Sequence, residues 1–432
     1  MIVESLTLKN FRCFKELQME FDERLTVLVG ANGVGKTTVL DGLVIFLEQI
    51  TLRISNSNAQ WVQFAIDSSD LSIESEIDKI TCEIKIYNRV LDWNFIPHKI
   101  KENIMCLEHD PSGMKDLKPI QDFIIDDGMK NGLPIFVCYS AQRCLTNSLP
   151  KYRNNADNNR IFADGFMPEI NFEASLNWFD GKDAEEARIR SNTPDKDYRN
   201  PELTAVRGAI AKSLGDSGKI YNFPHMEGNP PVFLINQIEN GRSYRVDKLG
   251  EGYKTMLAVV MDLARRMASA NAGRLDDILA SPAVVLIDEI ELHLHPSWQQ
   301  TVLPTLMNIF PHTQFIVTTH SPQVLTSIEP KHIRILENNK VWNVNTSTYG
   351  AQSWRVLEDV LGVSSRPRDN EAKKDLDAYF ALINTGEGTT QAALDLRHKL
   401  EEWLYDDPVL TEADMLISRQ ERAKARKAAP NA

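Results

Sequence analysis

The feature that most constrains the fold of this chain is a glycine-rich segment between a short apolar run and an amphipathic one. Residues 30–37 read GANGVGKT and fit the pattern G-x-x-x-x-G-K-[ST]. The apolar residues 25–29 predict a buried strand, and residues 36–50 predict a helix with one apolar face. Glycines let backbone N–H groups point at phosphate oxygens, and the helix N-terminus favours negative charge. The sequence therefore predicts an α/β core with a phosphate-binding loop.

The side chains of this loop indicate a nucleotide triphosphate with a metal ion. Lys36 offers a cation to the β and γ phosphates of ATP, and the Thr37 hydroxyl suits Mg²⁺. The other residues that we expect to contact the nucleotide here are Asn32, Gly33, Gly35 and Thr38.

Two acids and a histidine follow apolar runs far down the chain. Residues 284–289 end in Asp288 and Glu289, and residues 314–319 precede His320. The carboxyl ends of parallel strands meet at one edge of a sheet, where ligands bind. We therefore expect Asp288 to hold Mg²⁺, Glu289 to act as general base toward the attacking water, and His320 to hydrogen-bond the γ-phosphate and that water. The alternative is structural, with acids that cap helices and a histidine that only packs.

A fourth segment, Leu249 with Gly250, Glu251 and Gly252, precedes a helical pattern. Free amides at a helix N-terminus form a natural phosphate clamp, so we expect these residues to bind nucleotide. Two histidines at positions 293 and 295 also invite a zinc interpretation. An H-x-H pair without further ligands nearby is poor evidence for a metal, and we favour a hydrogen-bonded loop at a dimer interface.

Composition and charge narrow the class of protein. The 432 residues carry a formal charge of −12, which argues against strong non-specific DNA binding by this chain alone. The chain opens with an alternating strand pattern, unlike a signal peptide, and no apolar run reaches the length of a membrane span. We expect a cytoplasmic protein with no membrane partner. The five cysteines are odd in number, form no C-x-x-C pair and read as free thiols: Cys13, Cys82, Cys106, Cys138 and Cys144.

The spacing of the motifs predicts the domain organisation. We assign an ATPase core to residues 1–140 and 231–345, with an antiparallel β-ribbon within 51–130. A mainly helical insertion is expected at 145–230, and a helical C-terminal segment at 350–432. The predicted fold class is α/β, with a mixed β-sheet at its centre.

This set of motifs, in this order, resembles the ABC-type ATPases of the RecF, OLD and SMC group. Residues 8–14 are similar to the N-F-R-x-F motif of the group's first strand, where Arg12 and the aromatic residues would approach the nucleotide. Residues 287–299 resemble the combined Walker B motif and D-loop, and residues 319–323 resemble the switch-histidine loop. The resemblance implies an ABC-type P-loop ATPase fold that binds ATP and Mg²⁺.

Residues 203–207 and the segment 357–367 also resemble the small prokaryotic AAA-type proteins of this group, so the resemblance covers almost the whole chain. The chain is most like the PtuA-type antiphage defence ATPases of Septu and retron-associated systems. OLD and Gabija proteins carry a C-terminal TOPRIM nuclease, whereas the helical residues after the core contain no clear acidic metal cluster. The resemblance therefore implies a homodimer or higher homo-oligomer with a separate effector, expected to be an HNH nuclease, and possible contact with nucleic acid through the complex.

One residue departs from the family pattern. The signature is usually L-S-x-G, and Gly250 stands where the serine is expected. The backbone amides remain, but the hydroxyl contact to the partner's γ-phosphate is lost, which implies slow or regulated hydrolysis.

Three functions remain open at this point. The first is an ATP-gated sensor or regulator that controls a nuclease. The second is a RecF-like DNA repair ATPase, against which the acidic charge weighs. The third is a nucleotide-bound scaffold without turnover, which trace hydrolysis by the purified protein would exclude. The identity of the effector, whether an HNH nuclease, a TOPRIM nuclease or a retron reverse transcriptase complex, also stays open.

Overall fold

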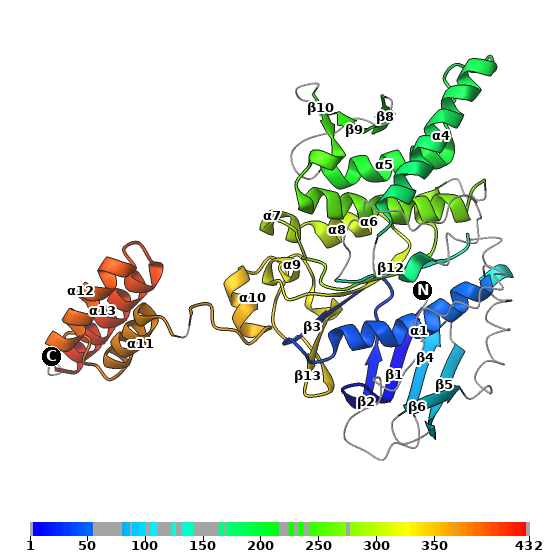
Figure 1. Ribbon diagram of the computed structural model, residues 1–432. Coiled ribbons are helices and arrows are strands. Elements are labelled where there is room, and N and C mark those ends of the chain that lie inside the picture. The colour runs from blue at the N-terminus through cyan, green and yellow to red at the C-terminus, as the bar shows by residue number, and fades with distance from the viewer. Residues whose placement is uncertain are drawn as a thin grey trace. The chain divides into compact units, whose positions relative to one another are not determined.

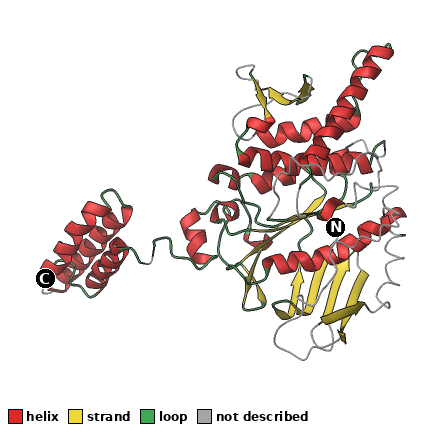
Figure 2. Ribbon diagram, viewed as in Figure 1, coloured by secondary structure: helices red, strands yellow, loops and turns green. Residues whose placement is uncertain are grey.

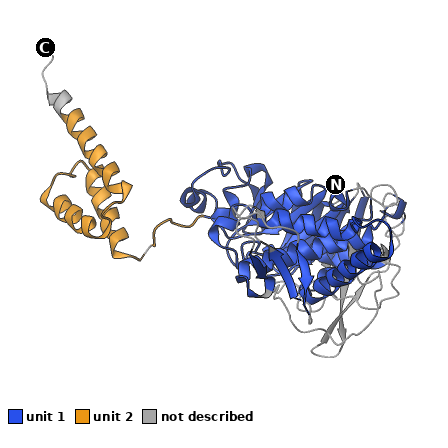
Figure 3. Cartoon of the chain, turned by 90° about the horizontal axis from the view of Figure 1, so that it is seen from above, with its two compact units in different colours: residues 1–361 blue, residues 362–432 orange. Residues whose placement is uncertain are grey.

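The computed structural model divides the chain into two compact units, Met1–Leu361 and Gly362–Ala432 (Figure 3). The two units are described separately. The structure describes residues 3–54, 80–86, 89–100, 104–109, 122, 124–126, 132–141, 164–167, 170–215, 224–228, 232–236, 242–273, 277–367 and 369–428.

A six-stranded sheet forms the centre of the larger unit (Figures 1 and 2). Its strands are β3 (Leu25–Val29), β7 (Ile135–Tyr139), β11 (Ala283–Ile287), β12 (Thr313–Thr318), β13 (Ile333–Glu337) and β14 (Lys340–Asn343). Their order is β14-β13-β3-β12-β11-β7, and every neighbouring pair is parallel except β13 and β14. Every residue of β3, β11 and β12 is buried, as continuous apolar strands covered on both faces require.

A five-stranded antiparallel sheet forms a second layer. Its strands, in the order β2-β1-β4-β5-β6, are β1 (Val3–Phe11), β2 (Phe14–Glu20), β4 (Ile80–Ile86), β5 (Arg89–Ile100) and β6 (Ile104–His109). The helix that follows the phosphate loop, α1 (Lys36–Ile54), contacts β1 and β4 of this sheet and β7 and β12 of the central sheet. The predicted apolar face of α1 is buried between the two sheets, so the phosphate loop sits on a rigid support.

Helices lie on the other side of the central sheet, some against the sheet and others in an outer layer on those helices (Figure 1). They are α4 (Phe172–Asn192), α5 (Pro201–Gly215), α6 (Glu251–Ala270), α7 (Pro296–Gln299), α8 (Val302–Ile309), α9 (Pro322–Leu325) and α10 (Ser353–Asp359). Single 3-10 turns lie at Asp164–Phe166, Val246–Lys248, Ile278–Ala280 and Pro330–His332. Helix α6 packs on β7 and α5, and the predicted stripe Met256, Val260, Leu263 and Met267 is buried.

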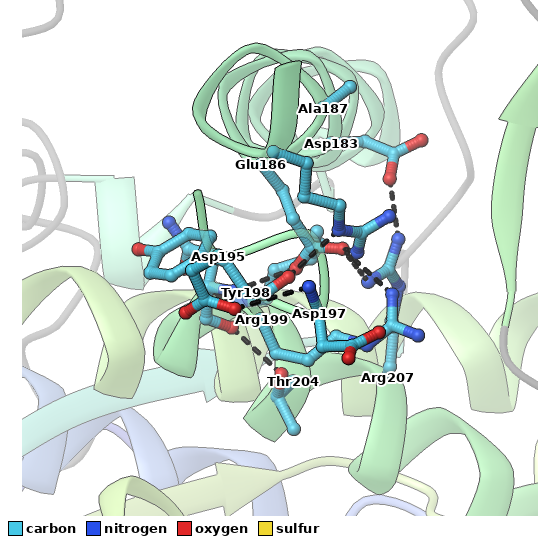
Figure 4. A network of polar contacts seen from close by, with 12 residues as sticks. Asp183, Glu186, Ala187, Asp195, Asp197, Tyr198, Arg199, Thr204 and Arg207 are labelled. Carbon is cyan, nitrogen blue, oxygen red and sulfur yellow. Dashed lines mark hydrogen bonds and ion pairs between the residues drawn. The ribbon is translucent and has the colours of Figure 1, made fainter. Parts of the chain in front are cut away.

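A buried carboxylate holds the helical insertion together (Figure 4). Glu186 on α4 is 1% exposed and accepts hydrogen bonds from Arg207 Nη1 on α5 at 3.1 Å and from the backbone N–H of Asn200 at 2.7 Å. Arg190 pairs with the same carboxylate, and Arg207 also pairs with Asp183. Arg207 belongs to the segment 203–207 that the family resemblance singled out, and its contacts tie α5 to α4.

The prediction that the core sheet resumes near residue 231 is wrong. The strand there, β9 (Val232–Asn236), pairs antiparallel with β8 (His225–Glu227) and β10 (Ser243–Arg245) in a separate three-stranded sheet. Phe233 and Ile235 are buried while their neighbours are half-buried, and the Phe233 ring packs edge-on against Phe179 of α4 at 5.0 Å. Burial at every second residue is typical of a strand that packs with one face only, here against the helical insertion. The strands β3, β11 and β12 of the central sheet are instead buried on both faces.

The smaller unit contains α11 (Glu371–Asn384), α12 (Gln391–Trp403) and α13 (Pro408–Ala428). The side chains of Asn370 and Thr390 cap the first two of these helices. Its core consists of Leu376, Tyr379, Ile383, Ala393, Leu400, Leu410 and Ala413.

The predicted α/β fold class is confirmed, with a mixed central sheet, an antiparallel sheet, a helical insertion and C-terminal helices. Within the described residues, no helix combines the length and apolar character needed to cross a membrane.

Candidate nucleotide-binding site

Three neighbouring parallel strands bring the predicted motifs to one edge of the central sheet. Strand β3 runs into the phosphate loop, β12 beside it runs into residues 319–321, and β11 beside that ends before Asp288. The backbone N–H of Thr319 donates to Leu28 O at 3.1 Å, and that of Ile290 donates to Thr318 O at 3.0 Å, so the three strand ends stay aligned. The structure therefore places Lys36, Asp288, Glu289 and His320 on strands and loops that are hydrogen-bonded to one another.

The phosphate loop needs glycine at two close approaches. Gly35 has φ +99°, and a Cβ built there would lie 2.4 Å from Phe14 Cζ and 2.6 Å from Cys13 Sγ. A Cβ on Gly30 would lie 2.4 Å from the backbone oxygen of Leu336 on β13. Side chains at these positions would collide with Phe14 and with the backbone of β13 and displace the loop. The two glycines therefore allow the close packing that fixes the path of the loop's backbone N–H groups.

Lys36 is folded back over this loop. Its Nζ donates to the backbone oxygens of Gly30 and Ala31 at 3.0 Å each, and the residue is 7% exposed. Burial lowers the pKa of Lys36, while the negative charges of Asp288, Glu289 and Glu291 raise it in part. The ammonium group of Lys36 is partly desolvated and therefore needs oxygen partners. Phosphate oxygens could replace the two backbone oxygens as acceptors of its hydrogen bonds.

The Asp288 carboxylate is fixed by two hydroxyls, one from the first turn of α1 and one from the last residue of β12. Thr37 Oγ1 donates to Asp288 Oδ2 at 2.9 Å, and Thr318 Oγ1 donates to Oδ1 at 2.6 Å. Asp288 is 6% exposed, and its backbone N–H donates to Tyr139 O at 2.9 Å. A hydroxyl and a carboxylate oxygen this close are the hard oxygen ligands that Mg²⁺ prefers, so Thr37 and Asp288 fit a magnesium ion.

Glu289 turns the chain sharply after β11. It has φ +48°, a left-handed conformation that is strained for a residue with a side chain, and its backbone N–H donates to Thr318 Oγ1 at 2.7 Å. The residue is half-buried at the edge of the site. This places Glu289 beside Asp288 on the loop that faces Lys36, where a base toward water is expected.

His320 is held through its backbone by a residue that the sequence analysis missed. Glu291 Oε1 accepts from the His320 backbone N–H at 2.6 Å, and Oε2 accepts from Thr319 Oγ1 at 2.7 Å. The only signal in the sequence is a third acid two residues after Glu289.

The signature segment lies apart from the phosphate loop of the same chain. Gly250 is exposed and precedes α6 with no side-chain cap, and a Cβ there would meet nothing within 4 Å. Glu251 is exposed and accepts from Lys254 Nζ at 2.9 Å. Gly252 packs against the loop after β11, because its Cβ would lie 2.7 Å from His293 O. Among the hydrogen bonds of the described residues, none joins the segment 250–252 to the phosphate loop.

The remaining predicted residues lie around the phosphate loop. Arg12, with φ +49°, pairs with Asp41 on α1, and its guanidinium carbon lies 5.2 Å from the centroid of the Phe11 ring. Phe11 and its neighbour Phe14 are fully buried, and the Phe14 ring packs against Gly35 of the loop. Asn32 and Gly33 are exposed at the loop, and Thr38 is buried beside Cys13.

The two histidines after β11 do not make a metal site in the described part of the chain. His295 accepts from the backbone N–H of Ser297 and caps α7, and no group of three or more candidate ligands occurs among the described residues.

Comparison with known families supports the predicted ATPase class. A model of an AAA ATPase domain matches residues 1–127. A second AAA-domain model, whose description names the AbiEii toxin of type IV toxin–antitoxin systems, matches residues 151–326.

Relatives that match along most of the chain include a retron ATPase and a Septu protein. The retron Ec83 probable ATPase of Escherichia coli is 26% identical over 97% of this chain and 87% of its own length. The Septu protein PtuA of Bacillus thuringiensis is 25% identical over 84% of this chain and 85% of its own length. The predicted resemblance to retron-associated and PtuA-type ATPases is therefore confirmed.

Among solved structures, the SMC head domain from Thermotoga maritima is 16% identical and has a TM-score of 0.39, over 80% of this chain and 100% of that chain.

Proposed function

We propose that this chain is an ATP-binding and ATP-hydrolysing sensor or regulatory subunit of a prokaryotic antiphage defence complex. In this proposal it dimerises around ATP and controls a separate effector nuclease, expected to be of the HNH type. The similarity to a retron ATPase and to a Septu PtuA protein over most of the chain supports the defence role.

The observation that carries the ATPase proposal is the convergence of three motifs on adjacent strand ends. Lys36 would contact the β and γ phosphates of ATP, with the backbone N–H groups of the phosphate loop around them. Thr37 and Asp288 would hold Mg²⁺, which supplies positive charge against the phosphate oxygens. Glu289 would accept the proton of the attacking water, and His320 would orient that water and the γ-phosphate.

The shared-site proposal follows from the position of the signature segment. The first amides of α6 are exposed at Gly250 and Glu251, and helix N-termini stabilise anions. A second copy of the chain, related by two-fold symmetry, would bring these amides to the ATP on the first copy and receive the same contact in return.

Gly250 provides the cleanest test of this shared site. Gly250→Asp introduces a negative charge where the partner's phosphate would lie, and a Cβ at this position would meet nothing within 4 Å. Gly250→Ser is the matched control, because serine and aspartate cap a helix about equally well. We expect the Asp variant to bind ATP normally but to lose hydrolysis by on the order of 10²–10³-fold, and the Ser variant to hydrolyse at least as fast as the natural chain. Gly252 is less suitable, because a side chain there would collide with His293 O.

Mixing two defective chains tests whether the sites are shared. A Gly250→Asp chain has an intact phosphate loop, and a Lys36→Ala chain has an intact signature. A mixed dimer contains one complete site, so an equal mixture should recover about a quarter of the natural activity, whereas neither variant alone is active. If the ATPase activity of no mixture exceeds that of either variant alone, the shared-site proposal is wrong.

Co-purification tests the effector proposal separately. A nuclease encoded beside this chain should co-purify with it, and the rate of nucleic-acid cleavage should change when the chain carries Glu289→Gln.

A further inference from the structure

Glu291 joins the loop after β11 to the loop that carries His320. Its two carboxylate oxygens accept from different atoms of that second loop: Oε1 from the His320 backbone N–H at 2.6 Å and Oε2 from Thr319 Oγ1 at 2.7 Å. Both oxygens are thus engaged with consecutive residues. The position of the His320 backbone is set from the neighbouring loop as well as from β12.

Two sharp turns aim Glu291 at this position. Glu289 and His293 both have positive φ angles, of +48° and +66°, and the backbone N–H groups of Leu292 and Leu294 donate two turn bonds at 2.9 Å to Glu289 O and Glu291 O. Between the turns, the buried Ile290 anchors the segment on the core. A strained and tightly bonded loop holds the carboxylate in one place, as a positioning group requires.

The two loops are also connected beyond His320. Ser321 Oγ donates to Gln299 Oε1 at 2.7 Å, and Gln299 Nε2 donates back to Leu294 O at 2.9 Å. The backbone N–H of Ser321 donates to Thr319 Oγ1 at 3.0 Å. A continuous chain of hydrogen bonds therefore runs from Glu291 through Thr319 and Ser321 to Gln299.

The loop after β11 also contacts α6, the helix that begins within the signature segment 249–252 and is called the signature helix below. His293 O lies where a Cβ on Gly252 would come within 2.7 Å, and the rings of Tyr253 on α6 and Trp298 on α7 pack edge to face at 4.0 Å. Residues 289–299 thus lie against the signature helix on one side and the His320 loop on the other. A displacement at one side reaches the other through packed atoms.

We propose that Glu291 is a positioning residue that places His320 for hydrolysis and links its position to the signature helix. The proposal rests on the proposed ATPase function. Glu291 acts through the backbone of His320 and the hydroxyl of Thr319, so its contribution depends on hydrogen-bond acceptance and on the presence of the histidine.

The charge of Glu291 must be separated from its hydrogen bonds, because that charge also raises the pKa of Lys36. Glu291→Gln removes the charge but keeps a carbonyl oxygen for the His320 N–H, while its NH₂ group can donate to the Thr319 oxygen. Glu291→Ala removes both partners. Glu329→Ala, which removes an exposed acid that pairs with Lys331, is the matched control.

The first experiment measures kcat and the Kd for ATP in these variants, with His320→Ala and the double variant Glu291→Ala/His320→Ala. A misplacement of about 1 Å costs on the order of 10²-fold in rate, so we expect Glu291→Ala to lose kcat by about that factor with little change in Kd. Glu291→Gln should retain most of the activity. The double variant should be no slower than His320→Ala, because Glu291 acts through the histidine.

The second experiment measures hydrogen exchange at the His320 amide without nucleotide, resolved with overlapping peptides. Glu291→Ala should speed this exchange by at least about tenfold, and Glu291→Gln much less. Three results would each overturn the proposal. They are an equal loss of kcat in Glu291→Gln and Glu291→Ala, a double variant slower than His320→Ala, and an unchanged exchange rate of the His320 amide in Glu291→Ala. A natural chain that binds ATP without hydrolysing it would instead refute the proposed ATPase function, and the exchange measurement would still decide whether Glu291 positions His320.

Discussion

Replacement of Asp262 by asparagine should destabilise the larger unit in a way that depends on pH. Asp262 lies on α6, is 2% exposed, and accepts from Arg266 Nε at 2.7 Å, Arg265 Nη2 at 2.8 Å and the Tyr139 hydroxyl at 3.0 Å. The two arginines lie on α6 itself, and the Tyr139 hydroxyl joins this signature helix to β7. The backbone oxygen of Tyr139, the last residue of β7, accepts from the N–H of Asp288.

The magnitude follows from the pKa of this carboxyl group. Burial raises the pKa of Asp262, but the charges and hydrogen bonds of Arg266 and Arg265 outweigh burial and lower it from 3.8 to about 2. That difference corresponds to about 2–3 kcal/mol of stability at pH 7. Because the folded-state pKa is the lower one, the contribution is complete well above pH 3.8 and is lost as the pH falls toward 2. About half of it remains at pH 3.

Urea denaturation of the natural chain and Asp262→Asn at pH 7 and pH 3 tests this reasoning. The variant also leaves the buried guanidinium group of Arg266 and the half-buried one of Arg265 without this carboxylate, so the total loss at pH 7 should be on the order of 3–5 kcal/mol. The difference between the two proteins should shrink by about 1 kcal/mol at pH 3. Asp359→Asn, which removes an exposed partner of Arg355, should cost less than about 0.5 kcal/mol at either pH. If the free energies of unfolding of the two proteins differ by the same amount at both pH values, Asp262 does not carry the stabilising negative charge.

Three further changes test the site and the insertion. Lys36→Ala should weaken ATP binding by about 3–4 kcal/mol in calorimetry without changing the circular dichroism spectrum, and unchanged affinity would contradict the loop assignment. Glu289→Gln should bind ATP with natural affinity, hydrolyse it very slowly and accumulate dimers in light scattering; natural turnover would exclude Glu289 as the base. Glu186→Ala leaves the buried Arg207 paired with Asp183 alone and the buried Asn200 N–H without its acceptor, and should cost about 1–3 kcal/mol of stability, whereas Glu185→Ala, which removes a half-exposed acid, should be nearly neutral in the same denaturation assay.

The strands and helices that build the site could be predicted because their signals are local. Strands β3, β11 and β12 each contain a short apolar run, and each precedes a loop with a recognisable motif. Helices α1 and α6 carry apolar residues at three- and four-residue steps. Each of these patterns is complete within about ten to twenty residues, so no long-range contact is needed to interpret it.

The parts that could not be predicted depend on contacts between distant segments. Strand β9 is as apolar as a core strand, and only its pairing with β8 and β10 and its packing on Phe179 assign it to the insertion. Glu291 is one acid among several in its loop until the His320 N–H is placed beside it. Arg207 was noted as part of a family motif, but its partner Glu186 lies on another helix.

The position of the insertion in the sheet explains how a sensor could act on the nucleotide site. Strands β7 and β11 are parallel neighbours, with Tyr139 opposite Ile287, and the chain that crosses between them contains α4, α5, the three-stranded sheet and α6. Tyr139 is held at both ends, because its oxygen accepts from Asp288 and its hydroxyl donates to Asp262 on α6. The ion pairs of Asp262 with Arg265 and Arg266 lie within α6, and the Tyr139–Asp262 hydrogen bond joins α6 to β7. We infer that a ligand which shifts the insertion moves α6 and, through Tyr139, Asp288, the proposed ligand of Mg²⁺. Asp262→Asn should therefore uncouple hydrolysis from any such ligand before it abolishes ATP binding.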